Sequence, residues 1–310
     1  IIILTVQPAN VILLLGLSII MGFGKAFIGT SVMHDSLHGS YIKDRSFKNV
    51  TNISAWILGV EATIWKLQHN VLHHSYTNIE EADEDIAPRY VLRFSPHQPL
   101  RWFHRFQHIY AVVLYSVMTL IWLFFKDFNK AFQYHKRGLL KTDSSFSFYI
   151  GKIIFRKVIY LGLLLVLPIY VLPVSAGWVF AMFLAMHLTA GLLLSLIFQP
   201  AHIIGTSEFF DTDQEGDQIK NNWWVHQLKT TSNFGMNNRV LFWLSGGLNH
   251  QIEHHLFPNI CHVHYKKLSV IVKNTAKEHG IPYHSQSTLG SAVYHHLRML
   301  KLLGQGKVSG

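Results

Sequence analysis

Four stretches of the chain are apolar over about the length that a helix needs to cross a lipid bilayer. A membrane-spanning helix takes about 20 predominantly apolar residues, and these stretches cover about residues 9–32, 106–125, 155–174 and 177–198. Only 14% of all residues are charged, against about 25% in a typical soluble domain. The pattern predicts an all-α integral membrane protein.

Charge decides which of these stretches we expect to cross the membrane. Ser175 and Ala176 alone join the last two stretches, which predicts a tight transmembrane hairpin. The apolar residues 1–4 are interpreted as the end of an earlier span, so the first of two hairpins would be truncated at its N-terminus. If 106–125 crossed, the lysines and arginines between residues 126 and 157 would face the outside, against the positive-inside rule.

We therefore expect 106–125 to be an interfacial helix. The prediction is a single domain over 1–310, with spans at about 9–32, 155–174 and 177–198. A cytoplasmic helical cap of residues 34–154 and 200–310 would complete it. This topology describes a multi-pass membrane protein with its polar site on the cytoplasmic side.

The composition also limits the chemistry. The 21 histidines outnumber the 17 acidic residues, and imidazole suits metal binding and proton transfer. The single Cys261 excludes disulfide frameworks, cysteine-ligated iron–sulfur clusters and cysteine-based zinc sites. A net charge of +10 fits nucleic acid, anionic lipid or an acidic substrate, but the apolar spans argue against a nucleic-acid partner.

The histidines gather in three short motifs and one isolated position. Histidines three or four residues apart share a face of a helix, and this spacing occurs in His34-x-x-x-His38 and His69-x-x-x-His73-His74. A third motif, Gln251-x-x-His254-His255, lies near the C-terminus. The complete set of candidate metal ligands is His34, His38, His69, His73, His74, His202, His254 and His255.

Eight histidines are too many for one ion, since a closed zinc site takes four ligands. Two metal ions are therefore predicted. Haem needs only one or two histidines, and magnesium or calcium prefers oxygen ligands. A pair of irons fits the number of imidazoles best, although ligand type leaves zinc and copper open.

The remaining histidines receive simpler interpretations. His187 lies within an apolar span, where either a functional role or a hydrogen bond to a neighbouring helix is expected. We interpret the following as polar surface residues in loops: His97, His104, His108, His135, His279, His284, His295 and His296.

The three motifs in this order resemble the membrane fatty acid desaturase superfamily. Gln251, where most branches have histidine, resembles the front-end branch and bacterial proteins similar to linoleoyl-CoA desaturase. The resemblance runs from about Ser31 to Leu303. It implies a non-haem di-iron centre with the eight histidines as ligands, and Gln251 in the place of a ninth.

The same resemblance implies the reaction and its partners. The centre would use dioxygen as co-substrate to insert a cis double bond into a long-chain fatty acyl group, carried by coenzyme A or by a lipid. Electrons would come from an external donor, either a ferredoxin or cytochrome b5, because no His-Pro-Gly-Gly motif occurs here. We expect the protein in a bacterial inner membrane.

Further residues are predicted around the metals. Ligand imidazoles usually donate their second N–H to a carboxylate or carbonyl, which suggests Asp35, Asp83, Glu84, Asp85, Asn249, Gln251 and Glu253 as orienting groups. The acidic run 80–85 could equally be a solvated loop. By resemblance, Trp65, Trp223, Trp224 and Gln227 flank the substrate, and Lys25 is a further candidate; the tryptophans could instead be interfacial anchors, and Lys25 could snorkel to the interface.

Two other functions remain open from the sequence. The same metal centre could hydroxylate or ketolate a lipid, which would add one oxygen to the product instead of removing two hydrogens. A membrane zinc sensor or transporter would place its ligands inside the spans, where only His187 lies, and would consume no oxygen.

Overall fold

The computed structural model describes residues 10–40, 48–86, 90–142, 144–211 and 222–308. The predicted remnant of an earlier span at residues 1–4 lies outside these ranges. The chain forms two compact units: the first comprises Ile1–Gly29, Ser46–Trp65 and Leu114–Ser195, and the second comprises Thr30–Arg45, Lys66–Val113 and Leu196–Gly310.

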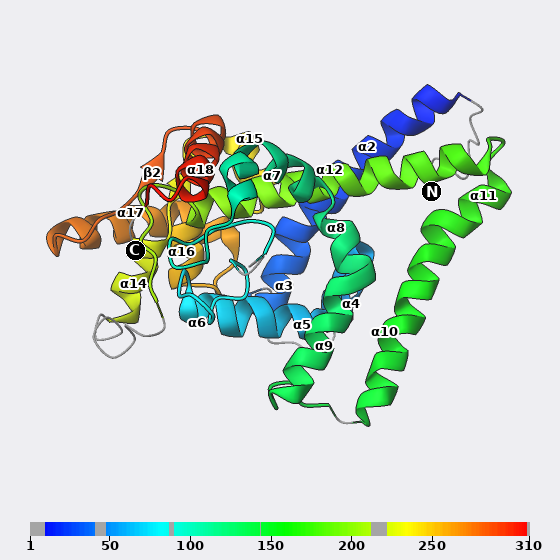
Figure 1. The fold of residues 1–310 in the computed structure, drawn as a ribbon, viewed down its shortest axis with the longest axis horizontal. Helices are drawn as coiled ribbons and strands as arrows, with labels where there is room; N and C mark the ends of the chain where they lie inside the picture. Colours follow the sequence, from blue (N-terminus) through cyan, green and yellow to red (C-terminus); the bar gives the residue numbers. More distant parts are fainter. Residues whose placement is uncertain (1–9, 41–47, 87–89, 143, 212–221, 309–310) are drawn as a thin grey trace. The chain divides into compact units, whose positions relative to one another are not determined.

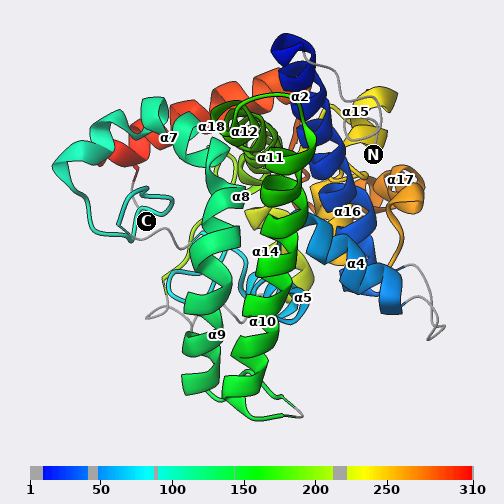
Figure 2. The same cartoon turned by 90° about the vertical axis from the view of Figure 1, so that its right-hand side faces the viewer.

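The first unit contains the long apolar helices. Its elements are α2 (Val11–Phe27), α4 (Lys48–Leu58), α5 (Ala62–Lys66), α8 (Met118–Ile121), η5 (Trp122–Lys126), α9 (Asp127–Lys136), α10 (Phe146–Leu161), η6 (Gly162–Val166), α11 (Leu167–Val171) and most of α12 (Ala176–His202). Asn10 starts α2 by accepting hydrogen bonds from the backbone N–H groups of Ile12 and Leu13, which are otherwise unsatisfied at a helix start. Helices α9 and α10 lie side by side in both views (Figures 1 and 2).

Three helical segments are long and apolar enough to cross a membrane: Val11–His38, Phe146–Val171 and Ala176–His202. A fourth span exists if Trp102–Ser116 and Met118–Lys136, which are bent at Val117, cross as one. The expected helix over 106–125 is therefore interrupted. At Val117 the backbone has φ −82° and ψ 0°, which departs from regular helix geometry.

The second candidate span begins at Phe146, nine residues before the predicted start at residue 155. The predicted span, residues 155–174, already contained the cations Arg156 and Lys157 near its start. Both have acidic partners, because Arg156 pairs with Glu61 and Lys157 with Asp127. A cation that pairs with an acidic side chain can lie within an apolar helix. The sequence pattern did not reveal these two pairs.

The second unit holds shorter elements. They are η1 (Ile28–Met33) from Thr30 onward, α3 (His34–His38), η3 (Leu67–His73), α6 (His74–Tyr76), η4 (Trp102–Phe106), most of α7 (Gln107–Ser116), α14 (Trp223–Thr230), α15 (Arg239–Leu244), α16 (Gln251–Leu256), η8 (His262–His264), α17 (Tyr265–Glu278) and α18 (Leu289–Gly304). The two short strands β1 (Asn233–Phe234) and β2 (Ser285–Gln286) pair in parallel.

Two apolar clusters hold the second unit together. The end of α12 packs with the following segments through Ile197, Ala201, Phe234, Leu248 and Ala292. A second cluster joins α14, α16 and α17. Since α16 carries His254 and His255 and α12 ends at His202, these clusters fix the elements that present the histidines.

Candidate metal centre

All eight predicted ligands lie in the second unit and are buried, with at most 6% of their surface exposed. They come from α3, η3, α6, the end of α12 and α16. The turns η1 and η3 are π-helical, a wide form that occurs mostly at functional sites. His69 and His73 nevertheless share a face, as their spacing predicted, with ring centroids 5.1 Å apart.

The imidazoles form two groups without shared members. His34, His38, His69 and His254 each offer one nitrogen atom within 4.8 Å of the others, and so do His73, His202 and His255. His74 forms a further group with His254 and His255 and therefore lies next to one member of each of the first two groups. The structure therefore brings the eight residues together as two adjacent sets of potential ligands.

The nitrogen spacing fits metal coordination. The Nε2 atoms of His34 and His69 are 3.2 Å apart. Two nitrogens bound at about 2.0–2.1 Å to one ion are roughly 3.0–3.4 Å from each other. These two rings are thus placed as ligands of a common ion would be.

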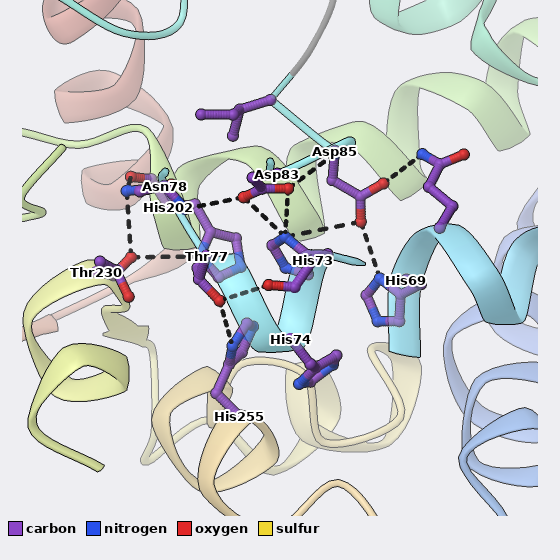
Figure 3. Close-up of polar contacts among 12 residues, drawn as sticks. His69, His73, His74, Thr77, Asn78, Asp83, Asp85, His202, Thr230 and His255 are labelled. Carbon is purple, nitrogen blue, oxygen red and sulfur yellow. Dashed lines mark hydrogen bonds and ion pairs between the residues drawn. The ribbon is translucent and has the colours of Figure 1, made fainter. Parts of the chain in front are cut away.

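Carboxylates fix the orientation of two imidazoles (Figure 3). His69 Nδ1 lies 2.9 Å from Asp85 Oδ2, and His73 Nδ1 lies 3.0 Å from both oxygens of Asp83. Because a carboxylate accepts the hydrogen bond, Nδ1 carries the proton and Nε2 is available to a metal. Asp83 is only 1% exposed, so the alternative of a solvated acidic loop is wrong at this residue.

Neutral groups orient three more imidazoles. His202 Nδ1 is 3.3 Å from the carbonyl oxygen of Thr230, His255 Nδ1 is 2.8 Å from Gln227 Oε1, and His254 Nδ1 is 3.2 Å from the hydroxyl of Tyr265. Within the described part of the chain, the Nε2 atoms of His74, His202, His254 and His255 are buried and have no hydrogen-bond partner. Buried polar atoms normally have partners, and a metal ion would supply one here.

The protonation of these groups suits metal binding. Burial, followed by neighbouring imidazoles, lowers the pKa of His74, His254 and His255 well below its usual value, so they are neutral ligands at pH 7. Burial also lowers the pKa of His69, to about 3. His73 differs: burial opposes protonation, but the charges of Asp83 and Asp85 raise its pKa to about 9, so a metal must displace a proton there.

Asp35 and Glu253, two other predicted orienting residues, make their shortest hydrogen bonds to residues that are not candidate ligands. Asp35 accepts hydrogen bonds from the backbone N–H and the Nδ1 of His262, at 3.2 Å and 2.7 Å, while its other oxygen is 3.8 Å from His34 Nδ1. Glu253 accepts from Asn233 and from the hydroxyl of Tyr283, at 2.9 Å and 2.8 Å. These contacts hold the backbone of the motifs.

Asn249 lies before α16, and Gln251 is the first residue of this helix. Asn249 donates to the backbone carbonyl of Gly235 at 3.2 Å and so supports the turn that precedes the motif. Gln251 is fully buried, and neither atom of its amide group has a hydrogen-bond partner among the described residues.

The predicted substrate residues are distributed over both units. In the second unit, Gln227 Nε2 and Trp223 Nε1 both donate to the backbone carbonyl of His74 at 3.2 Å. Trp224 is 46% exposed and packs against Trp223 and Phe257. The amide of Gln227 thus contacts two ligand residues, His74 and His255, directly.

Trp65 and Lys25 belong to the first unit, where both are buried. The ammonium group of Lys25 contacts the hydroxyl of Tyr160 and lies 3.4 Å from His187 Nε2. His187 also contacts Thr119 Oγ1 through Nδ1 at 2.9 Å. Lys25 therefore does not snorkel to an interface, and His187 takes part in a buried hydrogen-bond network.

Several functional neighbours escaped the sequence analysis. Tyr265, Thr230 and His262 contact ligands or their partners, and no spacing signal marks them because they meet the ligands only through the fold. His104 and His296 were expected in surface loops, which is wrong: they lie in η4 and α18 and are 1% and 0% exposed. His296 Nδ1 contacts the backbone carbonyl of Ile203 at 2.8 Å, directly after His202.

Known proteins resemble this chain over most of its length. An acyl-lipid (8-3)-desaturase of Physcomitrium patens is 37% identical over 300 residues, which cover 96% of this chain but only 62% of that protein. An sn-1 linoleoyl-lipid 6-desaturase of Arthrospira platensis is 34% identical over 287 residues, or 91% of this chain and 76% of that protein.

A Delta(5) fatty acid desaturase A of Dictyostelium discoideum is 30% identical over 93% of this chain and 63% of its own length. No solved structure gives a significant match. The sequence profile of the fatty acid desaturase family matches residues 9–287. The chain therefore belongs to the fatty acid desaturase family.

Proposed function

We propose that this protein is a dioxygen-dependent desaturase that inserts a cis double bond into a long-chain fatty acyl group. The observation that carries the proposal is the pair of buried imidazole sets, in each of which one nitrogen per ring lies within 4.8 Å of the others. In five of the rings Nδ1 contacts a carboxylate, carbonyl, amide or hydroxyl oxygen. Family membership supplies the reaction class.

We further propose that two iron ions occupy these sets. His34, His38, His69 and His254 would hold one ion, and His73, His202 and His255 the other, with His74 between them. Such a centre supplies the oxidising power needed to remove hydrogen from an unactivated methylene, while the protein provides position and excludes water. Electrons would arrive from a separate ferredoxin or cytochrome b5.

The chain's own residues set the geometry of this chemistry. Asp85, Asp83, Gln227 and Tyr265 hold the rings so that Nε2 faces inward, and the burial of all eight imidazoles keeps bulk water away. Gln251 lies in the same helix as His254 and His255, and its amide has no hydrogen-bond partner among the described residues. We assign Gln227 to the positioning of His255.

The site of desaturation is proposed from the relatives. Their names include linoleoyl-lipid 6-desaturase and Delta(5) desaturase, which place the new double bond near the carboxyl end of the acyl chain. We propose the same front-end position here, with the centre on the cytoplasmic side of a bacterial inner membrane. The cations between residues 126 and 157 support this orientation through the positive-inside rule.

The test is a reconstituted assay with iron-loaded protein, a reducing system, dioxygen and lipids that carry linoleoyl chains. We expect a product two mass units lighter, and a His255→Ala variant should form none. His279→Ala is the control because His279 is exposed at the end of α17. A product sixteen units heavier would instead establish a hydroxylase, and oxygen-independent zinc binding would refute an oxidative function.

A further inference from the structure

A cavity of about 280 Å³ opens on the second unit between α15 and the start of α17. Its volume is near the lower end of the range of about 300–1,000 Å³ for small-molecule sites. The groups that matter in its lining are the cations Arg239 and Lys266, the amide of Asn238, and the side chains of Phe242, Trp243 and Val263. None of the described lining residues is acidic.

The charges in this cavity favour an anion. Arg239 and Lys266 are exposed at the rim, so neither pays a large desolvation cost in the absence of a ligand. A guanidinium group binds a phosphate with two parallel hydrogen bonds, and a lysine ammonium adds a point charge. The combination of both with an amide donor is suited to a phosphate ester.

The surface around the cavity has the character of a membrane-facing helix. Val240, Trp243 and Leu244 are exposed by 68%, 53% and 55% and occupy positions i, i+3 and i+4 of α15. On η8 and α17, Val263, Val270 and Ile271 are exposed as well. An apolar helix face with cations and a tryptophan at its edge is typical of segments that lie in the lipid interface.

The cavity is also connected to the candidate metal centre. The rings of Phe242 and Trp243 lie 6.0 Å and 5.9 Å from that of His262, and His262 pairs with Asp35. Asp35 directly follows the ligand His34. A chain of contacts through Phe242 or Trp243, His262 and Asp35 therefore links the cavity to the candidate ligand His34.

We propose that this cavity binds the phosphate headgroup of an anionic membrane phospholipid whose acyl chain is the substrate. The inference rests on the proposed function for the role of the acyl chain, and on the cavity alone for the headgroup. It would anchor the lipid by its headgroup on the same unit that holds the candidate metal centre.

The test compares two double variants of the purified, iron-loaded protein in phosphatidylcholine micelles that contain phosphatidylglycerol. Arg239→Gln with Lys266→Gln removes both cations of the cavity. Lys273→Gln with Lys277→Gln removes two exposed charges further along α17 and serves as the matched control. Bound phosphatidylglycerol is counted by native mass spectrometry without reductant, so the measurement does not depend on turnover.

We expect the first variant to bind phosphatidylglycerol at least tenfold more weakly and the control to bind like the wild type. With phosphatidylglycerol that carries linoleoyl chains, KM should rise about tenfold while kcat stays unchanged. A single Lys266→Glu variant gives the same comparison if the double variant does not fold. Unchanged phosphatidylglycerol binding in a folded cavity variant overturns the proposal.

Competition between coenzyme A and phosphatidylglycerol is a further measurement. If it displaces phosphatidylglycerol only when Arg239 and Lys266 are present, the cavity is an acyl-CoA site and the lipid assignment is wrong. If phosphatidylglycerol binding depends on both cations but the wild type desaturates no lipid, the proposed function fails while the headgroup site stands.

Discussion

At the scale of single residues, Asp83 has the largest influence on one ligand. Its carboxylate contacts His73 Nδ1 with both oxygens and also accepts from the backbone N–H groups of Asn78 and Asp85, at 2.9 Å and 2.8 Å. An Asp83→Asn change removes the charge and leaves an amide that cannot accept at all these positions. Since such outer partners are worth about 10–100-fold in metal affinity, we expect iron to be lost at correspondingly lower chelator concentrations.

The measurement is the iron content per chain after dialysis against a graded series of chelator. Glu278→Gln is the control because Glu278 lies exposed at the end of α17. Equal iron retention in the Asp83 variant and the control would show that His73 does not depend on Asp83 for its orientation.

His296 gives a prediction about pH. It is fully buried on α18, and burial lowers its pKa to about 4. The unfolded chain, with a histidine pKa of about 6.5, takes up the proton first, so the stability from neutral His296 is present above pH 6.5 and is lost as pH falls toward 4. A His296→Gln variant does not titrate.

The difference in Tm between the wild type and His296→Gln should therefore shrink as pH falls from 6.5 to 4. His295→Gln on the same helix is the control for the substitution itself and is measured over the same pH range. A constant difference for His296 would mean that this residue is not held neutral by the fold.

The clustering of the candidate ligands was predictable because their spacing repeats on helices, whereas most of their hydrogen-bond partners were not. Asp83 and Asp85 stand close to the second motif in the sequence, and the prediction included both. Tyr265, Gln227 and Thr230 reach His254, His255 and His202 only through the packing of α14, α16 and α17. Contacts of this kind carry no local periodicity.

At the scale of elements, apolar length predicted the existence of the spans better than their ends. The second span starts nine residues earlier than expected, and the added segment, residues 146–154, contains a single charged residue, Lys152. The break at Val117 was also not predicted, since the flanking sequence contains neither proline nor glycine.

The close approach of α18 to η4 can be tested at one glycine. A Cβ on Gly304 would overlap with the backbone carbonyl of His104, whereas a Cβ on Gly290 of the same helix meets only Thr288 Oγ1 at 3.8 Å. Overpacking of this kind typically costs about 1–3 kcal/mol. We expect Gly304→Ala to lower the Tm by several degrees in detergent.

Gly290→Ala is the matched control, because the same substitution near the start of α18 should leave stability unchanged or raise it by up to about 1 kcal/mol. If both variants melt like the wild type, α18 and η4 can separate without loss, and the contact is not required for the fold of the second unit.

At the scale of the whole molecule, metal binding should couple to folding of the second unit. Its eight buried imidazoles come from five separate elements, which only the folded chain brings together. A ligand that binds the folded state alone stabilises it by about 2.7 kcal/mol at one hundred times its Kd. For a chain of this size that amounts to an increase in Tm of about 4 °C.

We therefore expect a chelator to lower the Tm of the iron-loaded protein and ferrous iron, added anaerobically, to restore it at two ions per chain. His254→Ala should abolish most of the iron-dependent increase, since His254 belongs to one of the two ligand sets and also faces His74 and His255. His279→Ala should retain the increase in full. A restoration complete at one ion per chain, or an equal response to iron in both variants, would contradict the two-ion assignment, because each set would then not contribute its own binding energy.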